Sequence, residues 1–159
     1  MCAAKKIITT LQAIEKIKHY FAASEHCQSE VRAKLSQYGM DADAIESVIC
    51  DLISEGYINE YRYAHAFIQG KFKIKGWGKN KIIASLRAKH ISTPCILSAL
   101  QTINDTAYQE KLQHLIQKWL HAHPENLTYS QRAKLMRYLL SKGYNMEDIN
   151  TAINSEITI

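Results

Sequence analysis

One short pattern occurs three times along this 159-residue chain. A leucine is followed four residues later by Gly, His or Gly, then by an apolar residue, a short polar residue and two further apolar residues. The three copies are Leu35, Gly39, Met40, Asp41, Ile45 and Ile49; Leu86, His90, Ile91, Ser92, Ile96 and Leu100; and Leu139, Gly143, Tyr144, Asn145, Ile149 and Ile153. Their internal offsets are identical, and the copies begin 51 and 53 residues apart. Such a period is typical of a modular array.

Each copy predicts a helix, a tight turn and a second helix. Val31 precedes Leu35 by four residues, a spacing that places both side chains on one face of a helix. The Gly, His or Gly position suits a left-handed helix end, which glycine adopts without a Cβ clash. The short polar residue predicts the N-cap of the second helix, and Pro94 fits the first turn of that helix in the middle copy.

A further helix is expected before each pair. Its apolar stripe is Leu11, Ile14, Ile17 and Phe21 in the first copy; Ala64, Phe67, Ile68 and Phe72 in the second; and Leu112, Leu115, Ile116 and Trp119 in the third. We therefore predict an all-α fold of three tandem three-helix (helix-turn-helix-like) repeats in an elongated array. The predicted parts are an N-terminal extension over residues 1–10, repeat 1 over 11–55, repeat 2 over 56–104 and repeat 3 over 105–159. Because a unit of about 50 residues buries little surface alone, neighbouring repeats are expected to pack together.

Charge distinguishes the repeats from one another. Residues 1–60 hold nine acids and six bases, residues 61–104 hold eight bases and no acid, and residues 105–159 hold six of each. An acid-free stretch of this length favours a polyanion or an acidic protein surface as the partner. The alternative is a basic face that only keeps the protein in solution.

Motifs for catalysis or cofactor binding are absent from the sequence. It contains no phosphate-binding loop, no dinucleotide fingerprint, no G-x-S-x-G and no H-E-x-x-H. His121 and His123 are two residues apart, so on a helix they point to different faces and are poorly placed to share a metal. We predict no catalytic residues, no cofactor and no metal.

The cysteines and the hydropathy indicate the compartment. The cysteines lie at positions 2, 27, 50 and 95, without a C-x-x-C pair, and are expected to be buried or half-buried structural thiols. No apolar run approaches the roughly 18 residues of a membrane span, and the first residues lack a signal-peptide core. The expectation is a cytoplasmic protein that does not enter a membrane.

The most unusual segment is G-K-F-K-I-K-G-W-G-K-N-K over residues 70–81. Phe72 completes a helical stripe and is expected in the core, whereas the place of Trp77 is open. One interpretation is a basic edge beside the N-terminus of a helix that starts near Lys81 with Asn80 as its cap, suited to phosphates or acidic side chains. In the other, the glycines form an inter-helix turn and the lysines are merely solvated.

A second basic cluster lies in the last copy. Lys134 and Arg137 are three residues apart and are neighbours on a helix, while Arg132 is only loosely on the same face. This cluster gains meaning only if it lies on the same side of the molecule as the middle one.

Several segments in order resemble the RecX regulatory proteins, bacterial modulators of the RecA recombinase. They are the three L-x3-[G/H]-hydrophobic copies, Y-I-N-E-Y-R-Y-A over 57–64, K-x4-G-x-G-x-N-K-I from Lys71 to Ile82, and K-L-M-R-Y-L-L-S-K-G-Y over 134–144. The resemblance covers residues 11–157. It implies an elongated helical protein without catalysis or cofactor that binds along the RecA–DNA filament and inhibits ATP hydrolysis and strand exchange. Direct contact with DNA is also implied.

The sequence departs from the family pattern at four positions. His90 stands where the helix cap is usually glycine, and Glu60 replaces the commoner Asp after Asn59. Lys71 and Lys79 occupy places where arginine is common, which weakens any argument that needs bidentate phosphate contacts. The apolar frame is unaffected.

The predicted partners are the RecA filament and, weakly and in a salt-dependent way, single-stranded or duplex DNA. The protein is expected to act as a monomer. The residues predicted to bind these partners are Arg62, Lys71, Lys73, Lys75, Trp77, Lys79, Lys81, Arg87, Lys89, Arg132, Lys134 and Arg137.

Two other classes of function stay open. A helix-turn-helix transcriptional regulator needs Arg, Asn or Gln on its recognition helix, and residues 45–52, 96–103 and 149–153 carry few of them. A helical scaffold that binds only proteins would show salt-insensitive binding and no affinity for DNA.

Overall fold

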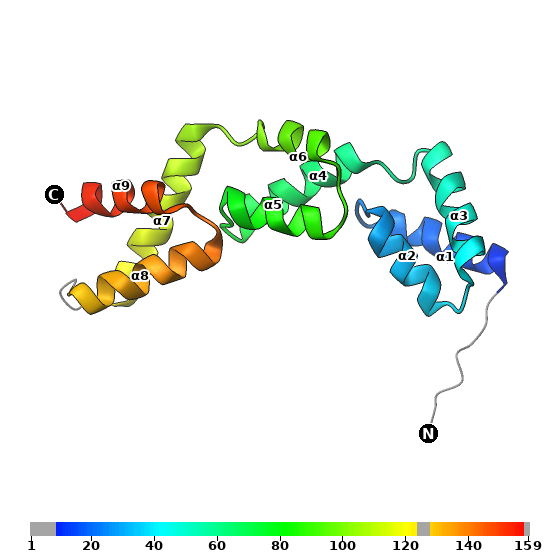
Figure 1. Cartoon of the computed structure of the whole chain (residues 1–159), viewed down its shortest axis with the longest axis horizontal. Coiled ribbons are helices and arrows are strands. Elements are labelled where there is room, and N and C mark those ends of the chain that lie inside the picture. Colours follow the sequence, from blue (N-terminus) through cyan, green and yellow to red (C-terminus); the bar gives the residue numbers. More distant parts are fainter. Residues whose placement is uncertain (1–8, 124–127, 158–159) are drawn as a thin grey trace, which may run out of the picture.

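The computed structural model describes residues 9–123 and 128–157, which form nine α-helices and one π-helix and no strand. Figure 1 shows them as three groups of helices that follow one another along an elongated molecule. The groups are α1 (Thr10–Phe21), α2 (Gln28–Gln37) and α3 (Ala42–Ser54); α4 (Glu60–Ile68), the π-helix η1 (Gln69–Ile74), α5 (Lys79–Ala88) and α6 (Thr93–Leu100); and α7 (Asp105–Ala122), α8 (Tyr129–Lys142) and α9 (Met146–Ile157). The predicted all-α class with tandem three-helix repeats is confirmed.

The predicted N-terminal extension over residues 1–10 lies almost wholly outside the described residues. Helix α1 begins at Thr10, and the Thr9 hydroxyl accepts a hydrogen bond from the Gln12 amide at 3.3 Å as its N-cap. The residue numbers at which one repeat ends and the next begins stay predictions, and we use "repeat 1", "repeat 2" and "repeat 3" for the three helix groups.

The repeated pattern encodes the same helix end three times. Gly39, His90 and Gly143 have φ angles of 86°, 61° and 94°, all in the left-handed region. The apolar residue that follows donates its amide to the carbonyl oxygen of the leucine of its own copy, at 3.4, 3.1 and 3.3 Å. This six-to-one bond is the Schellman helix end. Histidine fills the glycine position in repeat 2 at the cost of a strained backbone.

Two of the three predicted N-caps make the expected bond. Oδ1 of Asp41 accepts from the amide three residues on at 2.9 Å, and Oδ1 of Asn145 does so at 2.7 Å. Ser92 occupies the N-cap position of α6, but its side chain makes no capping bond. Its backbone N–H donates instead to Oε2 of Glu60 at 3.1 Å, so a carboxylate from α4 compensates this amide near the start of α6.

Two expectations about burial were wrong. Leu11, placed in the apolar stripe of the first helix, is 76% exposed, whereas Ala13 and Ile17 are fully buried. Ala13 and Ile17 are four residues apart on one face, and Leu11 lies two residues before Ala13, nearly on the opposite side of the helix. Cys50 is exposed rather than structural, while Cys27 is buried.

The buried side chains form two cores rather than three. The larger core joins repeats 2 and 3 and includes Ile68, Leu86, Ile116 and Leu139, all fully buried. The smaller core belongs to repeat 1 and includes Ile17, Leu35 and Ile49. Repeats 2 and 3 therefore share apolar burial, as expected for small helical units that cannot bury enough surface alone.

Repeats 2 and 3 meet end to end, through the backbone. The N–H groups of Gly78 and Asn80 at the start of α5 donate to the carbonyl oxygens of Lys142 and Gly143 at the end of α8, at 2.8 and 3.1 Å. The Lys81 ammonium group adds a bond to the Ser141 carbonyl at 2.9 Å. Amides left unpaired at one helix start thus pair with carbonyls left unpaired at another helix end.

This contact corrects the interpretation of residues 70–81. Helix α5 begins at Lys79 with Gly78 as its N-cap, two residues before the predicted start, and Asn80 is not the cap. The amides of Gly78 and Asn80 are occupied by α8, so these two groups are not available to a phosphate. Any anion must be bound by side chains instead.

We predict that Gly78→Ala and Gly143→Ala each lower the free energy of unfolding by about 2–4 kcal/mol. A Cβ at position 78 would overlap the Gly143 carbonyl group, and one at position 143 would overlap Lys81. Gly70→Ala is the matched control, because no atom lies within 4 Å of a Cβ there. Urea unfolding followed by circular dichroism measures all three, and equal stability of the three variants would contradict the tight α5–α8 contact.

Candidate functional site

Within the acid-free segment of residues 61–104, helix α4 is followed directly by the π-helix η1. In η1 the wider turn buries Phe72 at 6% exposure, as expected, and leaves Ile74 79% exposed between Lys73 and Lys75. Gly76 then ends this helix with a φ of 64° and packs against the side chain of Leu115 on α7. π-helical turns frequently occur at functional sites.

A groove of about 420 Å³ lies between η1, α7 and α8. No carboxylate lines it, and five of its lining residues are lysines, two from repeat 2 and three from repeat 3. Its walls are Lys73, Ile74, Lys75, Gly76, Lys111, His114, Leu115, Lys118, Tyr138 and Lys142. We call it the basic groove.

Two of the lysines are held in place by the carbonyl end of η1. Nζ of Lys111 donates to the carbonyl oxygen of Lys73 at 3.0 Å, and Nζ of Lys142 donates to that of Lys75 at 3.2 Å. Cations are favoured at helix C-termini, where carbonyl groups lack partners. The backbone of repeat 2 therefore positions ammonium groups that belong to repeat 3.

The sequence predicted Lys73 and Lys75 but missed the repeat 3 wall of the groove. Lys111, His114 and Lys118 follow one another at intervals of three and four, which places them on one face of α7. That spacing was a signal available in the sequence. What the sequence did not show is that this face meets η1.

Trp77 is half-buried and packs against the larger core. The ammonium groups of Lys71 and Lys81 lie 5.1 and 4.7 Å from the centre of its ring, and Lys71 also lies 5.2 Å from the ring of Phe67. The tryptophan thus anchors the turn and holds two of the predicted lysines by cation–π contacts.

Lys79 forms an ion pair with an acid of repeat 3. Its ammonium group lies 3.2 Å from Oδ1 of Asp105 and 4.6 Å from the ring centre of Tyr108. Burial raises the pKa of Tyr108 to about 12, so this phenol is uncharged under the lysine. Asp105, which lies just after the acid-free segment, therefore pairs with a lysine of that segment.

Arg62 and Lys89 form ion pairs with acids of repeat 1. Nε of Arg62 lies 2.8 Å from Oε1 of Glu25, and its guanidinium also donates to the Gly56 carbonyl at 2.7 Å. Nζ of Lys89 lies 2.6 Å from Oε1 of Glu30. Both bases connect repeats 1 and 2, so neither is a free cation on the surface.

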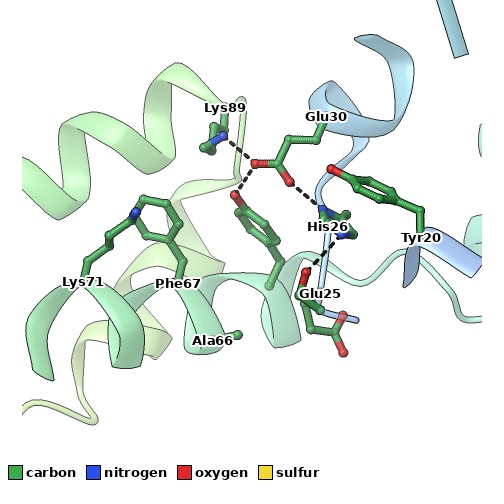
Figure 2. Close-up of a pocket in the computed structure, with 10 residues that line it drawn as sticks. Tyr20, Glu25, His26, Glu30, Ala66, Phe67, Lys71 and Lys89 are labelled. Atoms are coloured by element: carbon green, nitrogen blue, oxygen red, sulfur yellow. Dashed lines mark hydrogen bonds and ion pairs between the residues drawn. The ribbon is translucent and has the colours of Figure 1, made fainter. Parts of the chain in front are cut away.

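Glu30 is the centre of this junction. Its carboxylate also accepts from the Tyr63 hydroxyl at 2.8 Å and meets Nδ1 of His26 at 3.1 Å, and Figure 2 shows His26 and Lys89 reaching it from opposite sides. Burial raises the pKa of Glu30, but the hydrogen bonds from Lys89, Tyr63 and His26 outweigh it, and the pKa lies below its usual value of 4.5. Burial of the Lys89 ammonium group acts to lower its pKa, but the ion pair with Glu30 outweighs this effect and raises the pKa of Lys89.

The remaining predicted site residues are not brought into the basic groove. On α8 the residues that line it are Tyr138 and Lys142, whereas Arg132 bonds Oδ1 of Asn154 at 2.8 Å. Lys134 and Arg137 are exposed on the same helix, and Arg87 is exposed on α5. None of these four lines the groove.

Residues 9–123 and 128–157 lack both a cluster of metal ligands and a membrane-spanning helix. These residues contain no group of three His, Cys, Asp or Glu side chains placed to hold a metal ion. His123 stacks on Trp119 with ring centres 4.0 Å apart. Within the same ranges, no helix has the length and apolar character needed to cross a bilayer.

We predict that Glu30→Gln lowers the free energy of unfolding at neutral pH by about 1–2 kcal/mol, because the charged bonds to Lys89 and His26 are weakened. Because folding lowers the pKa of the Glu30 carboxyl group, its ionised form stabilises the fold at pH values above 4.5. This stabilisation is lost as the pH falls through the folded-state pKa. The wild type and the variant should therefore converge in acid. Urea unfolding between about pH 3 and pH 7 measures this, and a constant difference would contradict the assignment.

The sequence and the fold both match known proteins built of three-helix domains. Residues 59–100 match the second three-helix domain of RecX, and residues 106–153 match the third. The crystal structure of RecX from Lactobacillus salivarius superposes with a TM-score of 0.78 at 23% identity, covering 94% of this chain and 97% of that one. A second crystal structure of a regulatory protein RecX gives a TM-score of 0.81 at 18% identity over 91% of this chain and 73% of the other. These two likenesses establish the fold.

Relatives with higher identity carry the family assignment. The regulatory protein RecX of Clostridium botulinum (strain Eklund 17B / Type B) is 34% identical over 132 residues, which make up 82% of this chain and 61% of that protein. The regulatory protein RecX of Clostridium perfringens (strain 13 / Type A) is 32% identical over 133 residues, or 79% and 59%. The chain thus spans about 60% of the length of these relatives. On its domains, fold and relatives together, the chain belongs to the RecX family of regulatory proteins.

Proposed function

We propose that this protein binds the RecA–DNA filament and inhibits the ATPase and strand-exchange activities of the recombinase. Membership of the RecX family supports a regulatory role. The single observation that carries the binding surface is the basic groove, which gathers five lysines and no carboxylate from two repeats. Such a concentration of cations attracts a polyanion or an acidic protein face.

The groove narrows the set of residues expected to bind. Lys73 is exposed on η1 and Lys75 is exposed at its C-cap, and neither forms an ion pair with a carboxylate of the described residues. Lys111, Lys118 and Lys142 join them from repeat 3. Since Arg62, Lys79 and Lys89 are already paired with carboxylates, we assign to them a structural part in holding the repeats together.

Further properties follow as part of the same proposal. The protein acts as a non-catalytic regulator in the cytoplasm, without a cofactor, and as a monomer that lies along the filament. The three helix groups follow one another along an elongated molecule (Figure 1), a shape suited to an extended partner. Contact with DNA is electrostatic and weakens as salt rises.

The side chains of α6 argue against a helix-turn-helix transcriptional regulator. Helix α6 follows the turn of repeat 2, where a recognition helix would lie, and its sequence is T-P-C-I-L-S-A-L. It offers no Arg, Asn or Gln side chain for base edges, and Leu97 is its large exposed residue.

The test adds the purified protein to RecA on single-stranded DNA and follows ATP hydrolysis and strand exchange. We expect inhibition by the wild type. Lys73→Gln with Lys75→Gln should raise the concentration needed for half-inhibition roughly tenfold, because two charges of the groove are lost.

The matched control is Lys18→Gln with Arg32→Gln. This pair removes the same charge from repeat 1, where both side chains already bond carboxylates, at 2.6 Å each. It should inhibit like the wild type. No effect of the wild type at stoichiometric amounts would reject the proposed function, and equal loss in both pairs would reject the basic groove as its site.

A further inference from the structure

Repeat 1 is acidic in composition, yet one groove on it is lined by cations and tyrosines. The groove, of about 430 Å³, lies between α1 and α2 and is lined by Glu15, Lys16, His19, Tyr20, Lys34 and Tyr38. Nζ of Lys16 lies 5.5 Å from the ring centre of Tyr38, and Nζ of Lys34 lies 5.5 Å from that of Tyr20 and 5.9 Å from that of Tyr38.

Tyr20 also lines a second cavity, at the junction with repeat 2. This junction pocket measures about 430 Å³ and extends to Phe67 and Lys71. Figure 2 shows Tyr20 and Lys71 on opposite sides of it. Both hollows are lined by Tyr20, so they adjoin at this side chain and together mark a path from the α1–α2 groove to the junction with repeat 2. We call this path the aromatic track.

The charges along the aromatic track are not balanced. The two acids of the junction pocket are already engaged, Glu25 by Arg62 at 2.8 Å and Glu30 by Lys89 at 2.6 Å. Within residues 9–123 and 128–157, no carboxylate pairs with Lys16, Lys34 or Lys71. Glu15 also lines the α1–α2 groove, so three cations with aromatic neighbours face one carboxylate that has no ion pair within the same ranges, and the excess of positive charge is left for an anion from outside.

The aromatic neighbours make the anion more specific. Tyr20 and Tyr38 are half-buried, so their rings are held in place, and Tyr20 stacks on His26 with ring centres 3.6 Å apart. Alternating cations and fixed aromatic rings are the features with which proteins bind single strands, through phosphates and stacked bases respectively. A base that stacks on a tyrosine displaces a lysine held by a weaker cation–π contact, and the freed ammonium group can then meet a phosphate.

We propose that the aromatic track binds a single strand of nucleic acid, with Lys16, Lys34 and Lys71 at its phosphates and the rings of Tyr20 and Tyr38 against its bases. The proposal deepens the proposed function, since it locates a contact with the DNA of a filament. It assigns this contact to repeat 1 and its junction, apart from the basic groove. Binding of the strand itself requires no recombinase.

The experiment measures fluorescence anisotropy of two labelled oligomers of about 12 units, a length typical of single-strand sites. One is oligothymidylate, and the other has the same phosphates but abasic sugars. We expect the wild type to bind oligothymidylate roughly tenfold more tightly, because only this strand can stack. Lys16→Gln with Lys34→Gln should lower the slope of log affinity against log salt by about 1.4, since each phosphate contact of a single strand contributes about 0.7.

The control pair Lys18→Gln with Arg32→Gln matches this variant closely. It removes one charge each from α1 and α2, and both side chains point to carboxylates rather than to the aromatic track. Its salt slope should stay near that of the wild type. Circular dichroism checks that all variants are folded, and since Lys16 is exposed and Lys34 is outside the buried core, we expect them to be.

Several results would overturn the proposal. One is equal affinity for the two oligomers, which would indicate attraction to charge alone. Another is an equal loss of slope in the test pair and the control pair. Competition by polyglutamate as effective as by oligothymidylate would likewise assign the track to an acidic protein.

Failure of this proposal is distinct from failure of the proposed function. If the Lys16 and Lys34 variant binds oligothymidylate like the wild type while the protein still inhibits RecA, the aromatic track is rejected and the regulatory role stands. If oligothymidylate binding depends on these lysines but RecA is unaffected by the wild type, the track stands and the regulatory role is rejected.

Discussion

The head-to-tail contact between α8 and α5 is the constraint on which the rest of the structure depends. It pairs backbone groups that neither helix can satisfy alone, and it requires Gly78 and Gly143 because a Cβ on either would overlap the other helix. The contact aligns repeats 2 and 3 so that they share one core. It also carries Lys142 to the carbonyl of Lys75, and the basic groove exists because of that placement.

The junction of repeats 1 and 2 is of another chemical kind. Burial across it is slight, with Cys27 of repeat 1 joining the larger core and Ile58 joining the smaller one. Most of the contact is polar, through Glu30 and the pair of Arg62 with Glu25. Half-buried ion pairs orient two units more than they stabilise them, because desolvation offsets much of the attraction. Repeats 2 and 3 thus form one apolar body to which repeat 1 is oriented by charge.

Much of the fold could be predicted because its signals are local. The six-to-one bond of each turn spans a few residues, and the left-handed φ is required at one position, so the pattern appears directly in the sequence even where His90 replaces glycine. Predictions failed where a neighbour decided the outcome. Leu11 lies off the face that α1 buries, and the start of α5 is set by α8 rather than by Asn80.

For the candidate site, the sequence by itself determined that cations accumulate in repeat 2 and which of them share a helix face. Only the tertiary structure decided which cations stay available. Lys79 meets Asp105, 26 residues away, and Lys89 meets Glu30 at a separation of 59, while Lys142 reaches η1 across 67 residues. Helical periodicity and capping depend on neighbours within a turn or two of the chain. Charge pairing depends on distance in space, and only the packing of one helix on another sets that distance.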